Sequence, residues 1–142
     1  MADGNETNVV AALDAVIDRA CLLVEQDFAF GIILSRIARE LRRTYGVEGA
    51  KRFLLEFVAN LPPLNADVEV VVPDASYRMG ASEQAIWDMS YVLIDHARRM
   101  LLPARMFTIL LDRVAQRLGD IARPVLIGFA DSMATAGQYD QC

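Results

Sequence analysis

Apolar residues recur every three or four positions through most of this chain, and this spacing constrains the fold more than any other feature. Such spacing gives a helix one apolar face, whereas a half-buried strand would alternate at every second residue. The pattern predicts five or six helices packed as an all-α bundle with short connections. The periodic stretches cover 9–24, 30–45, 50–61, 82–102 and 103–118, and a last one begins near Pro124.

Capping residues and helix breakers predict where these helices end. Thr7 or Asn8 should cap the first helix, and Ser82 a later one, because a short polar side chain accepts from the free N–H groups of the first turn. Gly46 is a natural stop for the second helix. Other predicted boundaries are Pro103 as the first residue of a helix, Gly119 as a stop, and a break around Asp27 and Gly31 that leaves open whether the first two stretches are one helix or two.

One central stretch lacks the helical period. Residues 61–81 contain prolines, a glycine and several valines. Pro62 and Pro63 end the preceding helix, because proline lacks the amide hydrogen that a helix interior needs. We predict a long connection here, with an extended piece around residues 68–72 that has no second strand to pair with. Structureless connections of this length are uncommon inside compact domains and often carry function.

The chain is predicted to form one helical domain over residues 1–142, because this length provides for one core but not for two ordinary ones. Residues 1–7 and 137–142 are predicted to be disordered tails.

The segments "IILSRIARELRR" (32–43) and "ILLDRVAQRLGD" (109–120) are similar, and each is followed by another apolar helix. This leaves open a duplicated helical hairpin, although amphipathic helices of one composition look alike without any duplication.

Composition bears on where in the cell the protein is located and on the kind of genome that encodes it. No apolar run reaches the roughly 18 residues of a membrane span, and the polar, acidic start lacks the pattern of a secretory signal. Cys21 and Cys142 are the only cysteines and do not form a disulfide framework. We therefore expect a cytoplasmic protein. The ratio of thirteen arginines to the single Lys51 suggests a GC-rich bacterial or phage genome.

The segment "WDMSYVLIDHARRM" (87–100) holds the only tryptophan and the only histidine of the chain. A helix turns by about 100° per residue, so Trp87 and His96 point to roughly opposite sides. Most of the helix circumference is apolar, and Asp95 and Arg99 are spaced for an i,i+4 ion pair. We interpret the segment as a central helix that is buried on most sides, and not as an active site.

No pattern for catalysis or metal binding emerges. A single histidine, His96, cannot supply the paired Glu-x-x-His motifs of a two-metal bundle, and no Gly-x-Ser-x-Gly elbow accompanies it. Cys21, Cys142 and His96 are too few and too far apart for a zinc site. We predict no catalytic residue, no metal and no cofactor. Acid–base chemistry by carboxylates alone, at Asp88 or Asp95, is the one enzymatic route left open.

Residues 36–52 form an arginine-rich face in an otherwise acidic chain. A net charge of -5 argues against general attraction to nucleic acid, although a nucleic-acid-binding regulator that uses this face stays as an alternative. Acidic residues near the N-terminus and in the central connection complement the face, and such patches favour a charged protein partner or self-association. The predicted partner-binding residues are Arg36, Arg39, Arg42, Arg43 and Arg52.

The helices also carry more large apolar side chains than one narrow stripe each requires. A monomer of this length would expose a sizeable apolar patch, and such patches mark interfaces. We therefore predict a homodimer joined through helices. The surplus residues are Leu22, Leu23, Phe28, Ile32, Leu55, Ile109 and Ile127.

Two further classes of function stand beside nucleic-acid binding. The first, which we favour, is a non-enzymatic protein–protein interaction module: a small helical adaptor, inhibitor or regulatory subunit with an apolar and charged surface. The second is a small-molecule sensor with a cavity inside the bundle. The cavity residues would be Trp87, Tyr91, Met89, Met100 and His96. The sequence does not identify the partner, the pathway or the ligand.

Overall fold

The computed structural model describes residues 4–61 and 80–139, with side chains through residue 133. Every regular element in these ranges is helical, which confirms the predicted all-α class. The predicted connection at 61–81 falls almost entirely outside the described residues, as do residues 1–3 and 140–142. The helices are α1 (Gly4–Leu23), α2 (Gln26–Val58), α3 (Ala81–Met100), α4 (Pro103–Leu118) and α5 (Ala122–Tyr139), with a short 3-10 helix, η1 (Gly119–Ile121), before α5.

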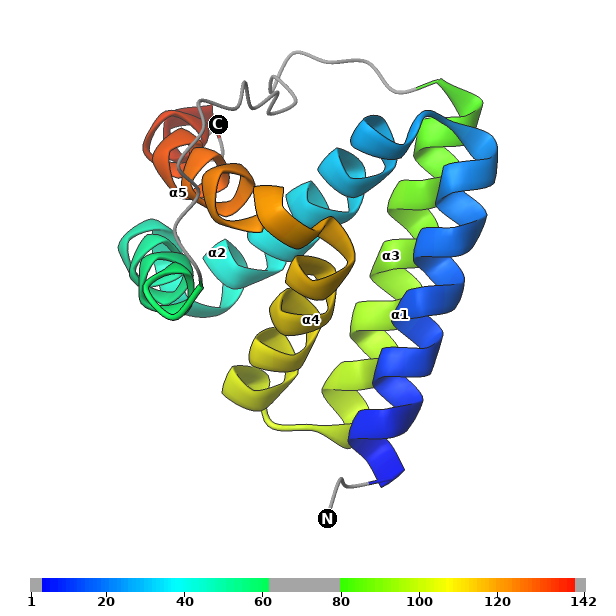
Figure 1. The fold of residues 1–142 in the computed structure, drawn as a ribbon. Coiled ribbons are helices and arrows are strands. Elements are labelled where there is room, and N and C mark those ends of the chain that lie inside the picture. The colour runs from blue at the N-terminus through cyan, green and yellow to red at the C-terminus, as the bar shows by residue number, and fades with distance from the viewer. Residues whose placement is uncertain (1–3, 62–79, 140–142) are drawn as a thin grey trace.

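Helices α1, α3 and α4 stand side by side, and α2 runs obliquely away from the upper ends of α1 and α3 and passes behind α5, against which it packs (Figure 1). α1 and α4 run in the same direction, and α3 runs opposite to both, since it descends from the end of the bundle where α1 finishes (Figure 1). α2 has its most extensive contacts with α5 and also packs against α3. This last contact positions the site described below.

The core lies where the apolar faces of all five α-helices meet. Each fully buried side chain of the size of leucine or phenylalanine contributes about 1.5–3 kcal/mol relative to exposure. Every α-helix contributes buried side chains to this core. The central residues are Leu13 and Ile17 from α1, Ile33, Ile37 and Leu41 from α2, Ile86 and Ile94 from α3, Met106, Phe107 and Leu110 from α4, and Leu126 from α5.

Glycine and proline set several helix ends as the sequence predicts. Pro103 lies in the first turn of α4, where its missing N–H has no helical partner to lose. Gly119 follows α4 with φ 69°, and Gly46 interrupts α2 with φ 76°. Positive φ favours glycine because glycine has no Cβ. α2 is therefore two helical segments joined at a kink, and the predicted stop at Gly46 is this kink.

Other boundaries differ from the prediction. The predicted capping roles of Thr7, Asn8 and Ser82 are wrong. α1 begins at Gly4 and includes residues expected in the tail, because a contact with α4 holds its first turn: Arg105 Nε donates to Glu6 Oε1 at 2.9 Å. α3 begins at Ala81 with Gly80 as the N-cap residue. The break between the first two helices falls at residues 24–25, so they are two helices.

The two similar segments lie in α2 and α4. Each runs into a glycine with positive φ, followed by another helical segment. Their charged positions are used differently, however. Arg36 and Glu40 are buried in α2, whereas the aligned Arg113 and Arg117 are only partly buried and pair with α1. The duplicated hairpin stays a prediction.

Candidate functional site

Helices α2 and α3 bring together residues that the sequence assigns to two separate sites. The guanidinium carbon of Arg36 lies 4.6 Å from the centre of the Trp87 ring and 4.5 Å from the centre of the Tyr91 ring. Both distances are within the range of cation–π attraction. Arg36 itself is only 7% exposed. The predicted arginine face and the aromatic part of the predicted cavity are therefore one site.

A buried carboxylate lies next to this stack. Glu40 is 2% exposed, and Arg98 of α3 donates from Nη2 to its Oε2 at 2.7 Å. The other oxygen, Oε1, faces Arg36 Nη2 at 3.5 Å and Arg43 Nη1 at 3.7 Å. A buried carboxylate is strongly destabilising without such cations. We call Arg36, Glu40, Arg43 and Arg98 the Glu40 cluster.

The Glu40 cluster is incompletely hydrogen-bonded. Within the described part of the chain, Arg36 Nε and Glu40 Oε1 are buried and have no hydrogen-bond partner. A buried polar atom in this state costs about 1–3 kcal/mol. Burial lowers the pKa of Arg36, Glu40 raises it, and the charges of Arg39 and Arg43 lower it further. The cluster therefore concentrates positive charge at some cost in stability.

The remaining predicted arginines are not equivalent. Arg39 is exposed and extends the site, with its guanidinium carbon 5.9 Å from the centre of the Trp87 ring. Arg42 is half-buried on the same helical segment. Arg52 lies beyond the kink at Gly46, in the segment of α2 that points in another direction (Figure 1). It lines a shallow, open depression of mixed charge and does not belong to the cationic site.

We use the name arginine–aromatic face for the Glu40 cluster together with its neighbours on both helices. The face spans the line where α2 and α3 pack against each other. Its members are Arg36, Arg39, Glu40, Arg43, Trp87, Tyr91 and Arg98.

The other predicted cavity residues lie elsewhere on α3. Met89 and Met100 are half-buried and pack against the core. Met89 lies about 200° around the helix axis from Trp87, as its spacing of two residues requires. His96 is exposed on the side opposite Trp87. The structure does not bring these three residues to the aromatic pair, and a cavity that uses all five stays a prediction without support from their placement.

The interpretation of α3 as buried on most sides is wrong. Its buried residues form one face, which packs on α1 and α2. Val92 is 65% exposed, and His96 is also exposed. The predicted ion pair is present, with Arg99 Nη2 3.1 Å from Asp95 Oδ2. The apolar residues of a helix sequence do not show by themselves how many neighbouring helices will pack against that helix.

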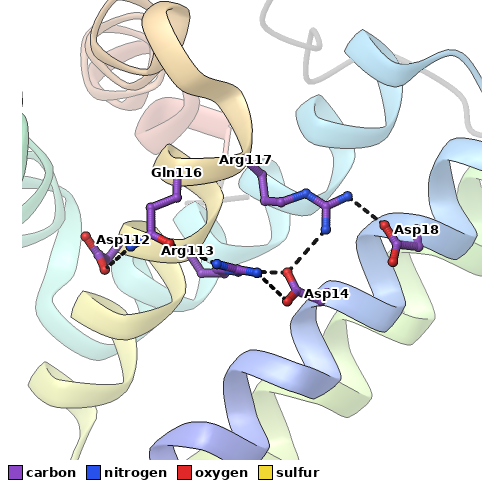
Figure 2. A network of polar contacts seen from close by, with 6 residues as sticks. All are labelled: Asp14, Asp18, Asp112, Arg113, Gln116 and Arg117. Atoms are coloured by element: carbon purple, nitrogen blue, oxygen red, sulfur yellow. Dashed lines mark hydrogen bonds and ion pairs between the residues drawn. The ribbon is translucent and has the colours of Figure 1, made fainter. Parts of the chain in front are cut away.

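A second charged network joins α1 to α4 (Figure 2). Arg113 donates from Nε and Nη2 to the two oxygens of Asp14 at 2.8 and 2.7 Å. Arg117 reaches Asp14 at 3.3 Å and Asp18 at 2.6 Å. The hydrogen bond from Arg113 is the largest cause that lowers the pKa of Asp14 below its ordinary value. The hydrogen bond to Asp18 raises the pKa of Arg117.

The sequence carries a signal for this network in the spacing of its charged residues. Each pair in the ladder Glu6–Arg105, Asp14–Arg113 and Asp18–Arg117 is 99 residues apart. A constant separation means that the two helices are parallel and in register. The same ion pairs neutralise Glu6, Asp14 and Asp18 within the chain. These acids belong to the N-terminal segment that we expected to attract a partner.

The surplus apolar residues divide into two groups. Ile32 and Ile109 are buried in the core, and Ile127 is half-buried. The exposed ones do not come from a single helix face. They are Leu22, at 86% exposed, and Leu23 at the end of α1, Phe28 at the start of α2, and Leu55 beyond the kink.

The described residues contain neither a membrane-spanning helix nor a group of metal ligands. Within residues 4–61 and 80–139, no helix combines the length and the apolar character that crossing a membrane requires. In the same ranges, no three His, Cys, Asp or Glu side chains are grouped closely enough to hold a metal ion.

Comparison with known proteins adds no relative: no protein-family model matches this chain, and neither a curated protein nor a solved structure does.

Proposed function

We propose that this protein is a non-enzymatic protein–protein interaction module that binds an acidic partner through the arginine–aromatic face. The observation that carries the proposal is the charge balance of that face. Three guanidinium groups surround one carboxylate, Glu40, and a fourth, Arg39, lies over the neighbouring Trp87. The face is therefore strongly cationic in a chain whose net charge is -5.

The residue types support a protein interface. Arginine, tryptophan and tyrosine supply a large share of the binding energy at such interfaces. Two of the guanidinium groups are held before any partner arrives: that of Arg98 by Glu40, and that of Arg36 by Glu40 on one side and by Trp87 and Tyr91 on the other. Side chains that are already ordered lose less conformational entropy on binding.

The placement of the other arginines favours a protein over a nucleic acid. Nucleic acids are bound through a run of phosphate contacts. The arginines of α4, however, pair with acids of α1: Arg105 with Glu6, and Arg113 with Asp14. The cationic surface therefore does not extend along α4. A small-molecule sensor is also less well supported, because Arg36 already occupies the aromatic rings that a ligand would need.

We propose, as the composition predicts, that the module works as a homodimer in the cytoplasm. The exposed apolar side chains support self-association, above all Leu22 and Leu23 at the end of α1 and Phe28 at the start of α2, which flank one short connection. Light scattering on a sizing column over a dilution series is the test. A mass of one chain at every concentration would rule out the homodimer and leave the interaction face intact.

Charge reversal tests the interaction face itself. The double variant Arg39→Glu/Arg43→Glu should lose capture of partners from host lysate and lose binding to a labelled polyglutamate peptide. Both positions are exposed, so we expect the helical circular dichroism signal to be unchanged. The matched control is Arg99→Glu, at an exposed arginine of α3 that pairs with Asp95. Equal binding by the double variant and the control would contradict the proposal.

A further inference from the structure

We propose that the group recognised by the arginine–aromatic face is a phosphomonoester dianion on a polypeptide segment, held by Arg43 and Arg98 above Glu40. This inference rests on the proposed function and names the chemistry that the partner must carry.

The charge of the Glu40 cluster matches a dianion. Arg36, Arg43 and Arg98 bring three positive charges to one carboxylate, which leaves two in excess around Glu40. Arg39 lies over Trp87 and is not counted, because it is outside the Glu40 cluster. A phosphorylated side chain carries about -1.5 to -2 charges at neutral pH. A partner carboxylate carries one charge and would leave half of the excess unbalanced. The cluster is therefore better matched to a phosphoryl group than to a second Asp or Glu.

The hydrogen-bond donors point to the same group. A guanidinium has five N–H donors in a rigid fork. Glu40 is approached by one nitrogen of Arg98, at 2.7 Å, and by one nitrogen of Arg43, at 3.7 Å. The two side chains come from different helices and remain 42% and 62% exposed. Their other N–H groups are thus accessible to a ligand, and arginine forks match phosphate oxygens in a bidentate manner.

The buried half of the cluster holds this arrangement in place. Arg36 packs against Trp87 and Tyr91 and has an unpartnered, buried Nε. Glu40 keeps an oxygen without a hydrogen bond although three cations surround it. Neither group gains full hydrogen bonding from the fold, so stability alone does not account for them. They serve as the support that fixes the outer arginines.

The cationic surface is confined to one spot, which favours a single dianionic group over the regularly spaced phosphates of a nucleic acid. On α3, Asp88 lies about one turn before Tyr91 and Asp95 about one turn after it. Asp88 accepts a hydrogen bond from Gln84, and Asp95 pairs with Arg99. These acids would repel the further phosphates of a nucleic-acid strand. A single phosphoryl group needs only the donors of Arg43 and Arg98, and the exposed ring of Tyr91, about two turns before Arg98 on α3, offers an apolar surface for an adjoining side chain.

The test is fluorescence anisotropy with the full chain and three labelled peptides. All have the same Gly/Ala background and differ only in one central residue: phosphoserine, serine or glutamate. We expect the phosphoserine peptide to bind at least about tenfold more tightly than the glutamate peptide, a difference of about 1.4 kcal/mol. We expect the serine peptide not to bind measurably. Equal affinity for phosphoserine and glutamate would overturn the inference.

Variants locate the site on the molecule. Arg98→Gln should abolish the preference for phosphoserine, and so should Arg43→Gln. Because Arg98 neutralises the buried Glu40, its loss could unfold the chain. Arg43 is more exposed and makes only a long contact, so the fold should tolerate its replacement and the test remains decisive. Arg99→Gln is the matched control and should keep wild-type affinity. An unchanged preference in a folded Arg43→Gln variant would overturn the assignment.

Two further probes separate this inference from the proposed function. Inorganic phosphate that competes as well as the phosphopeptide would show a small-anion site and overturn the polypeptide assignment. A single-stranded oligonucleotide that binds more tightly than the phosphopeptide would overturn both proposals. Binding of polyglutamate without any preference for phosphoserine would overturn only the inference of a phosphoryl group. The proposed binding of an acidic protein partner would be unaffected.

Discussion

Arg36 and Trp87 form the central contact of the candidate site, with the guanidinium carbon of Arg36 4.6 Å from the centre of the indole ring. The chain has one tryptophan, so its fluorescence reports on this contact directly. The contact joins a buried cation of α2 to an aromatic residue of α3. The packing of α2 against α3 therefore determines where the positive charge of Arg36 lies beneath the arginine–aromatic face.

Replacing Arg36 with methionine should change both stability and fluorescence. The substitution removes a buried cation, but Glu40 keeps Arg98 as a partner, so we expect a loss of about 1–2 kcal/mol in the free energy of unfolding. Trp87 emission should shift, because its cationic neighbour is gone. Urea denaturation followed by tryptophan fluorescence measures both. A variant with wild-type stability and an unchanged spectrum would contradict the cation–π contact.

The Glu40→Gln substitution should destabilise the protein more strongly, by about 2–4 kcal/mol. It leaves Arg36, Arg43 and Arg98 facing one another without a neutralising carboxylate. Chemical denaturation measures the effect, with Glu48→Gln at an exposed position of α2 as the matched control. The control should change stability by less than about 0.5 kcal/mol. Equal effects of the two substitutions would mean that the buried carboxylate has no structural role.

Asp14 makes the stability of the protein depend on pH. Its pKa in the folded state is lowered from the ordinary value of 3.8, chiefly by the hydrogen bond from Arg113. Its contribution is therefore complete above about pH 4 and is lost as pH falls through the lowered folded pKa. Because both side chains remain partly exposed to solvent, which screens the pair, we expect less than about 1 kcal/mol. The stability difference between wild type and Asp14→Asn should accordingly shrink below pH 4, and a constant difference from pH 6 to pH 2.5 would contradict this account.

Gly46 tests the kink in α2. Its φ of 76° lies in the left-handed region, so Gly46→Ala should destabilise the protein by about 1–2 kcal/mol. A Cβ at this position would meet no other atom within 4 Å, so the effect isolates backbone strain from steric overlap. Gly4→Ala is the matched control, since Gly4 also has open space around its Cβ position but no positive φ. Thermal melting that shows the same midpoint for both variants would argue that α2 straightens without cost.

Much of the fold could be predicted because helices are local structures. The spacing of apolar residues predicts the helical class, and Pro103, Gly46 and Gly119 mark ends or kinks through their own backbone chemistry. The predictions failed where contacts between helices act. The first turn of α1 is an example, since the contact between Glu6 and Arg105 extends the helix beyond its predicted start.

The candidate site was predictable only in parts. The sequence indicates an arginine-rich face and an aromatic pair, but it assigns Arg36 to an exposed surface and Trp87 to a separate cavity. Their contact depends on how α2 packs against α3, and no local pattern contains that information. Glu40 was not singled out at all, because a glutamate in a run of arginines is typical of an exposed helix surface.

By itself, the sequence determined the helical class, the positions of the main breaks and the presence of both charge signs on the same chain. Only the tertiary structure decided which charges are left over. The acids of α1 and the arginines of α4 neutralise each other, as between Asp14 and Arg113, whereas the arginines around Glu40 exceed their one carboxylate. The physical reason is the short range of ion pairing in water, where screening leaves only groups within a few ångströms to neutralise each other effectively. Which groups are that close is a property of helix packing.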